Sequence, residues 1–298
     1  MILHFGSKKA KSNILLYGWQ DMLVLLFFSV LFLRTFEVFD LTALFSWFCL
    51  KCCINIICLK SWYRVLMKNC NDPQLIVMLT YNDHTLENAV EIFEQCENSN
   101  AKIFGFKETG LPIEKMKALY SYMNKCGKTT VLEVVAYTEK ECMEGAQLAA
   151  ECGCSILMGT MFFDSVNEFC KANRLKYMPF IGKVTDRPSV LEGTIDKMLD
   201  EANRCLEKGV FGFDLLGYRY TGDAVELIEK FVSHLDAPVC VAGSINSYER
   251  LDEVRNAGAW AFTIGGAFIE NKFDGTYEEQ INKVCEYVTL DRKTLINV

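Results

Sequence analysis

The chain has 298 residues, enough for one large α/β domain and an additional segment. From residue 67 onward, 24 Lys and Arg stand against 35 Asp and Glu, a net charge of −11, so the basic surface that nucleic-acid binding requires is excluded. The 14 cysteines are scattered without paired CxxC motifs, and only His84 and His234 follow residue 67, so we expect a reducing compartment, no metal site and no cofactor.

Residues 1–66 form a hydrophobic leader. Met22–Leu33 is almost wholly apolar but short for a membrane span, and the second apolar stretch, 41–59, carries Lys51 near its centre. Three interpretations stay open: a membrane hairpin, a single anchor, or a segment outside the native protein, whose synthesis would begin at Met67. We expect a cytoplasmic protein in the last case and a membrane-anchored one if the leader is genuine.

From residue 75 onward, short apolar runs alternate with helical patterns at intervals of about 20 to 35 residues. This alternation is typical of repeated βα units in a parallel sheet. We predict strands at 75–79, 103–106, 131–135, 156–158, 177–181, 211–216, 239–242 and 261–264. We predict helices at 84–98, 112–126, 138–152, 163–173, 194–208, 221–234, 247–257 and 276–288.

Eight strands and eight helices predict a closed (β/α)8 barrel, the TIM-barrel fold, over residues 67–298. An open doubly wound sheet is the alternative. Its dinucleotide-binding GxGxxG motif is absent after the first predicted strand, where Thr80-Tyr81-Asn82-Asp83 stands instead.

Charged residues at strand ends indicate where chemistry takes place in this fold. Lys107 ends the second predicted strand, and Glu133 lies inside the third at a similar height. We predict that these two residues pair and transfer a proton, because a carboxylate inside a strand is costly unless it faces a cation or a polar pocket. A buried structural ion pair is the alternative. Asp214, inside the sixth strand, is either a third polar wall of the site or an interior hydrogen-bond acceptor.

The last two predicted strands both end in glycine, at Gly243-Ser244 and at Gly265-Gly266. Without a Cβ atom the backbone amides can approach an anion closely, and the corresponding loops frequently form the phosphate site of TIM barrels. We therefore predict that Gly243, Ser244, Gly265 and Gly266 bind phosphate. The alternative is that the glycines only permit turns.

Three further charged residues lie on loops. Arg187 and Arg219 are either ligands for a second anionic group of a substrate or solvated side chains. Asp83 is either a weak site candidate or the cap of the predicted helix 84–98.

Parts of the sequence resemble the ribulose-phosphate-binding barrels, a superfamily that includes isomerases of histidine and tryptophan biosynthesis and sugar-phosphate epimerases. The segment AGSINSYERLDEVRNAGAWAFTIGGAFIENKF is similar to their phosphate-binding end. GFDLLGYRYTG resembles the sixth-strand segment of N-acetylmannosamine-6-phosphate 2-epimerases, and FGFK, ending at Lys107, resembles their second-strand segment with its catalytic lysine. That family has an acidic residue where this chain has Ala242, so the resemblance implies the phosphate site more than the reaction.

We expect an isomerase or epimerase that acts on a sugar phosphate or a related phosphorylated carbonyl metabolite, with proton transfer shared by Lys107 and Glu133. One alternative is a lyase in which Lys107 forms a Schiff base with the carbonyl group. Another is a non-catalytic sugar-phosphate sensor. The expected partner is a phosphorylated small molecule, and a homo-oligomer stays open.

Overall fold

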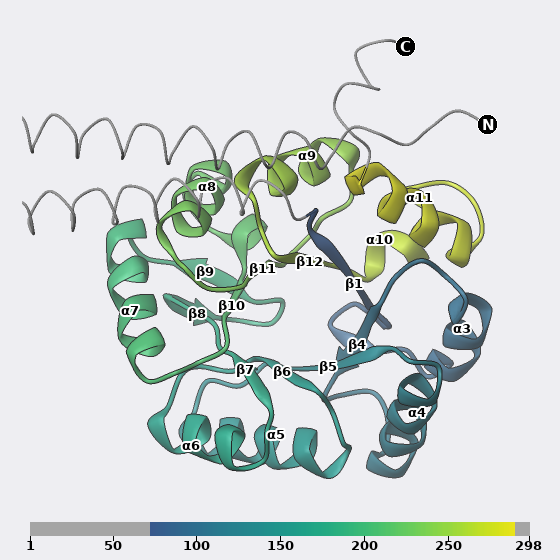
Figure 1. The fold of residues 1–298 in the computed structure, drawn as a ribbon, viewed down its shortest axis with the longest axis horizontal. Helices are drawn as coiled ribbons and strands as arrows, with labels where there is room; N and C mark the ends of the chain where they lie inside the picture. The colour runs from purple at the N-terminus through teal and green to yellow at the C-terminus, as the bar shows by residue number, and fades with distance from the viewer. Residues whose placement is uncertain (1–71, 290–298) are drawn as a thin grey trace, which may run out of the picture. The chain divides into compact units, whose positions relative to one another are not determined.

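Eight parallel strands form a closed barrel in the computed structural model, which describes residues 72–289 (Figure 1). The strand order is β10-β11-β12-β1-β4-β5-β6-β7, and a bridge between Phe180 and Asp214 joins the two edges. Asp214 N also donates a hydrogen bond to Pro179 O at 3.1 Å across this seam. The predicted (β/α)8 barrel is therefore confirmed, and the predicted leader, 1–66, lies outside the described residues. The barrel strands are β1 (Gln74–Met78), β4 (Ile103–Lys107), β5 (Thr129–Val134), β6 (Ile156–Gly159), β7 (Lys176–Met178), β10 (Phe213–Leu215), β11 (Val239–Val241) and β12 (Ala261–Ile264).

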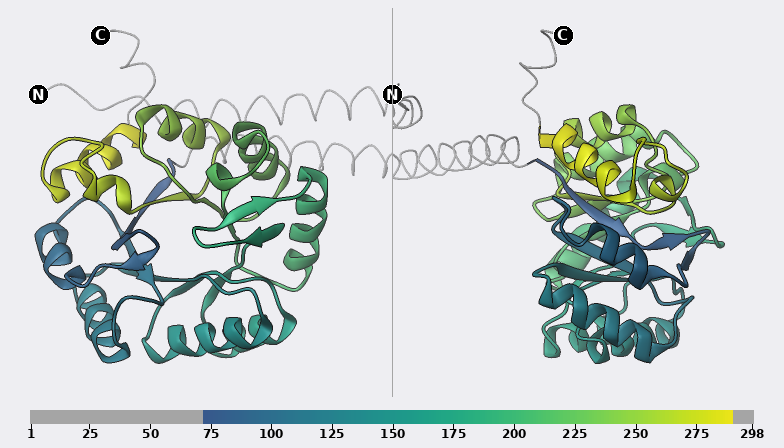
Figure 2. Two further views of the ribbon diagram at one scale, coloured as in Figure 1. Left: turned by 180° about the vertical axis from the view of Figure 1, so that it is seen from behind. Right: turned by 90° about the vertical axis from the view of Figure 1, so that its right-hand side faces the viewer.

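Helices surround the barrel on its outside (Figures 1 and 2). Local signals fix several of their ends: a capping box between Thr138 and Glu141 opens α5, and Gly258 ends α9 in the left-handed conformation at φ 76°. No helix within 72–289 is both long and apolar enough to cross a membrane. The helices are α3 (Ala89–Cys96), α4 (Ile113–Lys125), α5 (Glu139–Glu151), α6 (Asp164–Ala172), α7 (Ile195–Glu207), the 3-10 helix η1 (Gly217–Arg219), α8 (Ala224–His234), α9 (Tyr248–Ala257), α10 (Gly266–Ile269) and α11 (Tyr277–Thr289).

Two short antiparallel hairpins add to the predicted βα repeats. The first pairs β2 (Thr80–Tyr81) with β3 (His84–Thr85), and the second pairs β8 (Lys183–Thr185) with β9 (Val190–Glu192). The first hairpin takes the place of the start of the predicted helix 84–98, which begins only at Ala89. Its turn residues, Asn82 and Asp83, have φ angles of 46° and 67°, the left-handed conformation that a two-residue hairpin turn requires and that Asn and Asp tolerate. The interpretation of Asp83 as a helix cap is therefore wrong.

The interior of the barrel is apolar along most of its length. Phe211 and Trp260 contact each other edge to face, with ring centroids 5.8 Å apart, and pack against this interior. Lys107 and Glu133 face inward at the carboxyl ends of β4 and β5, and Asp214 of β10, the register partner of the interior residue Cys240, is a further buried polar residue on this inner face. The site is thus confined to the end of the barrel where the strands run into their loops. The buried interior residues are Ile76, Met78, Ile103, Val131, Ile156, Met158, Met178, Cys240 and Ala261.

Candidate active site

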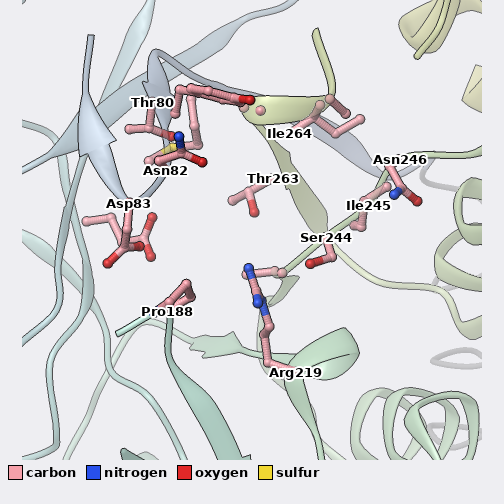
Figure 3. A pocket seen from close by; sticks show the side chains of 18 of the residues that line it. Thr80, Asn82, Asp83, Pro188, Arg219, Ser244, Ile245, Asn246, Thr263 and Ile264 are labelled. Atoms are coloured by element: carbon pink, nitrogen blue, oxygen red, sulfur yellow. The ribbon is translucent and has the colours of Figure 1, made fainter. Parts of the chain in front are cut away.

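A cavity of about 290 Å³ lies at the carboxyl ends of the barrel strands (Figure 3). Its lining brings together the two groups of residues that the sequence singled out separately. Lys107 and Glu133 lie on one side, and the loops 243–246 and 264–267 lie on the other. Other lining residues include Thr80, Asn82, Asp83, Pro188, Ser189, Arg219 and Glu270.

Lys107 lies between two carboxylates. Its Nζ atom is 3.3 Å from Glu133 Oε1 and also forms an ion pair with Asp83 Oδ1. The three side chains are only 11 to 14% exposed, and Lys107 and Glu133 are register partners on neighbouring strands. Burial by itself lowers the pKa of Lys107, but the carboxylates of Glu133 and Asp83 outweigh burial, and the pKa is raised. Lys107 is therefore a charged ammonium group that can donate a proton or stabilise a negative oxygen.

Asp83 is the residue of this group that sequence reasoning undervalued. The turn of the β2–β3 hairpin places it over the end of β4, and Thr85 secures the hairpin there. Thr85 Oγ1 donates to Lys107 O at 2.8 Å, and Lys107 N donates to the same Oγ1 at 2.9 Å. The one signal in the sequence is the pair Asn82-Asp83, since these residue types favour a tight turn directly after a strand.

Arg187 lies in the loop of the β8–β9 hairpin and contacts two carboxylates. Its Nε atom is 2.9 Å from Asp83 Oδ2, and its Nη2 atom forms an ion pair with Glu108 Oε1. Burial raises the pKa of Glu108 although Arg187 opposes this. The structure thus places Arg187 against the protein's own carboxylates and outside the cavity lining, and its charge links the hairpin to Asp83.

Asp214 is buried in the barrel wall at 1% exposure and does not line the cavity. Neither of its carboxyl oxygens has a hydrogen bond of ordinary geometry within the described residues, and the backbone amide of Gly159 is the donor that faces the carboxyl group. Burial raises its pKa well above the usual range, the Glu133 carboxylate raises it further, and Lys107 opposes the shift. The neutral form of Asp214 is therefore favoured beside the Lys107–Glu133 pair, because a buried carboxylate without an ion-pair partner would be costly.

The opposite side of the cavity suits an anion. Figure 3 shows the guanidinium group of Arg219 and the hydroxyl group of Ser244 pointing into the same space. Within 72–289, Arg219 forms no ion pair, and the amides of Gly243, Ser244 and Ile245 donate no hydrogen bond. Gly243 has φ 91°, and a Cβ atom there would lie 2.7 Å from Arg219 Cγ, so only glycine fits. An unpaired guanidinium group next to free amides is an anion-binding arrangement.

The second glycine pair completes this side of the cavity. Gly265 packs closely on β2, where a Cβ atom would lie 2.8 Å from Thr80 Oγ1. The first amides of α10, those of Gly266 and Ala267, have no acceptor within their own helix. Glu270 also lines the cavity, and its carboxylate pairs with Lys272 at 3.5 Å.

Comparisons with known proteins identify the fold. No protein-family model matches the chain, and no curated protein matches it significantly. Among solved structures, tryptophan synthase from M. tuberculosis matches with a TM-score of 0.55 at 14% identity, over 76% of this chain and 96% of that one. Orotidine 5'-phosphate decarboxylase from Pyrococcus horikoshii OT3 matches with a TM-score of 0.53 at 10% identity, over 73% and 100%. A structure described as native KDPGal matches with a TM-score of 0.53 at 13% identity, over 75% and 96%. The chain therefore has the (β/α)8 barrel fold that these structures share.

Proposed function

We propose that the protein is an isomerase or epimerase that acts on a sugar phosphate or a related phosphorylated carbonyl metabolite. One observation carries this proposal: a single cavity is lined by the unpaired Arg219 with the free amides of 243–245 on one side and by the Lys107–Glu133 pair on the other. A substrate that spans both would be held by its phosphate group and would present its carbonyl end to an acid and a base.

The size of the cavity supports a small substrate. About 290 Å³ is near the lower limit of small-molecule sites, which run from about 300 to 1,000 Å³. A compact phosphorylated metabolite fits this range better than a dinucleotide. The phosphate group would accept hydrogen bonds from Arg219 and from the amides of Gly243, Ser244 and Ile245.

The charges of the other side support proton transfer next to a carbonyl group. Glu133 would accept the proton from the carbon atom next to the carbonyl group. The electron pair of that C–H bond would form a C=C bond, the π pair of the carbonyl group would move to its oxygen, and the Lys107 ammonium group would stabilise the resulting enolate. Return of the proton to the same carbon atom on its other face, or to the neighbouring carbon atom, gives an epimer or an isomer. Asp83 would hold the Lys107 ammonium group in place. Asp214, in its neutral form, would add no negative charge next to Glu133.

The acid that the epimerase family has before the glycine of the seventh strand is absent here, where Ala242 stands. In this proposal Glu133, which lies in the third βα unit, serves as the acid–base residue instead. A Schiff-base lyase would need the neutral amine of Lys107, and the carboxylates that raise its pKa work against that form.

The test is solvent-proton exchange. Phosphorylated aldoses and ketoses are incubated with the protein in heavy water, and deuterium beside the carbonyl group is followed by NMR. We expect incorporation with at least one compound, and a loss of more than about 100-fold in Lys107→Met and in Glu133→Gln. Arg204→Gln, on the exposed face of α7, is the matched control and should exchange at the wild-type rate.

Two outcomes contradict the proposal. Full exchange activity in both Lys107→Met and Glu133→Gln would remove these residues from the mechanism. Binding of sugar phosphates without any exchange would favour the sensor, which keeps the phosphate site and lacks the reaction.

A further inference from the structure

A second arginine lies behind the loop 243–246, outside the cavity lining. Arg250, in the first turn of α9, donates from Nη1 to Ser244 O and, at 3.4 Å, to Asn246 Oδ1. Its guanidinium group also lies over the ring of Tyr218, 4.6 Å from the centroid. Arg250 thus contacts the loop 243–246 without lining the cavity.

The contact with Ser244 bears on the shape of this loop. Ser244 has φ 55°, a left-handed conformation that residues with a Cβ atom rarely adopt. Its carbonyl oxygen is taken by Arg250, while its amide and the amides of its two neighbours have no acceptor within the described residues. Arg250 therefore stabilises the backbone conformation that leaves these amides free for a ligand.

Arg250 also connects the loop to η1, which carries Arg219 next to Gly243 on the same side of the cavity. Tyr218, on which Arg250 stacks, directly precedes Arg219 in η1. The Tyr218 hydroxyl group donates to Glu253 Oε2 at 2.7 Å and lies 3.2 Å from Arg250 O, so it attaches η1 to α9. The stacking of Arg250 on Tyr218, together with its hydrogen bond to Ser244 O, thus fixes the position of η1 relative to the loop 243–246.

The charge balance around the loop indicates which anion it fits. Neither Arg219 nor Arg250 has a carboxylate within ion-pair distance among residues 72–289. The nearby acids do not pair with these arginines: Glu253 accepts a hydrogen bond from Tyr218, and Glu270 pairs with Lys272. Two arginines without an ion-pair partner in this part of the chain, next to free amides, favour an anion of charge −2 over one of charge −1.

We propose that Arg250 is a positioning residue that fixes the loop 243–246 and, by its charge, makes the site select dianionic phosphate monoesters over monoanions such as carboxylates and phosphodiesters. This inference rests on the proposed function, because it concerns the same anion site. The inference names the ionised form of the ligand, a phosphate monoester with charge −2. It also names Arg250 as a residue that positions the loop without contacting the ligand.

The test compares two anions by calorimetry. Sulfate has charge −2 at every pH used, whereas methyl phosphate, a monoester with a second pKa of about 6, is mostly a monoanion at pH 5.0. For the wild type we expect sulfate affinity to change little between pH 7.5 and 5.0, and methyl phosphate affinity to fall about tenfold, because at pH 5.0 only about one molecule in ten is a dianion.

Variants separate the role of Arg250 from that of the site itself. Arg250→Gln should weaken both anions about tenfold at pH 7.5 and reduce the pH effect on methyl phosphate to about threefold, since it removes one positive charge. Arg250→Lys keeps the charge and should retain most of the pH effect with a smaller loss of affinity. Tyr218→Phe keeps the stacking ring and should lose less than Arg250→Gln, and Arg204→Gln should match the wild type.

The outcomes distinguish this inference from the proposed function. If the wild type binds neither anion, or if Arg219→Gln binds both as tightly as the wild type, the proposed anion site itself fails. If the wild type binds both and Arg219→Gln does not, but Arg250→Gln keeps the wild-type affinity and pH effect, only the role of Arg250 is overturned. A merely structural role would weaken both anions equally at both pH values and leave the pH effect unchanged, which also overturns the inference. If Arg250→Gln does not fold, as judged by its melting curve, the comparison of Arg250→Lys with the wild type decides.

Discussion

Replacing Asp214 by asparagine isolates the cost of keeping a carboxyl group inside the barrel wall. Asp214 is 1% exposed, its carboxyl oxygens have no hydrogen bond of ordinary geometry among the described residues, and burial and the Glu133 carboxylate raise its pKa. In the unfolded chain the same carboxyl group titrates at about 3.9. Because the folded pKa is above the unfolded one, the stability that protonated Asp214 contributes is fully present below about pH 3.9 and is lost as the pH rises toward the folded pKa.

The magnitude follows from linkage. While Asp214 stays protonated in the folded state, the wild type loses about 1.4 kcal/mol of unfolding free energy per pH unit relative to Asp214→Asn, which does not titrate. From pH 4.5 upward the difference should change at this slope in favour of the variant until the folded pKa is reached. The unsatisfied amide group of the new asparagine adds an offset that does not depend on pH, so the slope is the diagnostic quantity.

The assay is urea unfolding of both proteins at several pH values, with Asp196→Asn, an exposed position on α7, as the matched control for the substitution itself. A difference between wild type and Asp214→Asn that is flat over this range, or that changes in favour of the wild type, would show that Asp214 is ionised in the folded protein. The account of the Lys107–Glu133 pair with a neutral neighbour would then be wrong.

Three further predictions concern single positions. Gly266→Asp should abolish the rise in melting temperature that a phosphate monoester causes, whereas Gly266→Asn, with a side chain of the same shape as Asp, should keep part of it. A Cβ atom at this position meets only Tyr81, at 3.4 Å, so the difference between the two variants comes from the negative charge that repels the ligand. Equal shifts in both variants would count against this site. Borohydride with an exchanging substrate should leave the mass of the protein unchanged, and an adduct on Lys107 that is missing in Lys107→Met would support the lyase instead. Gly105→Ala should destabilise the barrel by about 1–3 kcal/mol, because its Cβ atom would lie 2.5 Å from Val131 O. Gly127→Ala, with open space around it but φ 72°, should cost about 1 kcal/mol. The reverse order of the two losses in urea unfolding would refute the packing of the barrel interior.

The barrel itself could be predicted from the sequence because its signals are local and repeated. Each strand is a short apolar run, and each run is followed by a helical pattern with recognisable ends. The pairing of Lys107 with Glu133 followed from the same logic, since residues at the ends of consecutive parallel strands lie side by side.

The network around this pair could not be predicted from the sequence, because it depends on short elements and distant contacts. Strands of two residues, as in the β2–β3 hairpin, are too short for a periodic pattern, so the sequence predicts a helix from residue 84, with Asp83 as its cap or as a weak site candidate. Arg187 and Glu108 are 79 residues apart, and only the path of the β8–β9 hairpin brings them together. Arg250 lies on a polar helix, where its sequence context is that of a solvated side chain.

The central claim is that the anion end and the acid–base end of the cavity serve one substrate. The most direct measurement is a crystal structure of the protein soaked with a phosphorylated ketose. The account predicts that the phosphate group lies between the Arg219 guanidinium group and the amides of 243–245, with the carbonyl oxygen within hydrogen-bond distance of Lys107 Nζ. A phosphate group bound elsewhere on the barrel, or a bound sugar whose carbonyl end points away from Lys107 and Glu133, would contradict it.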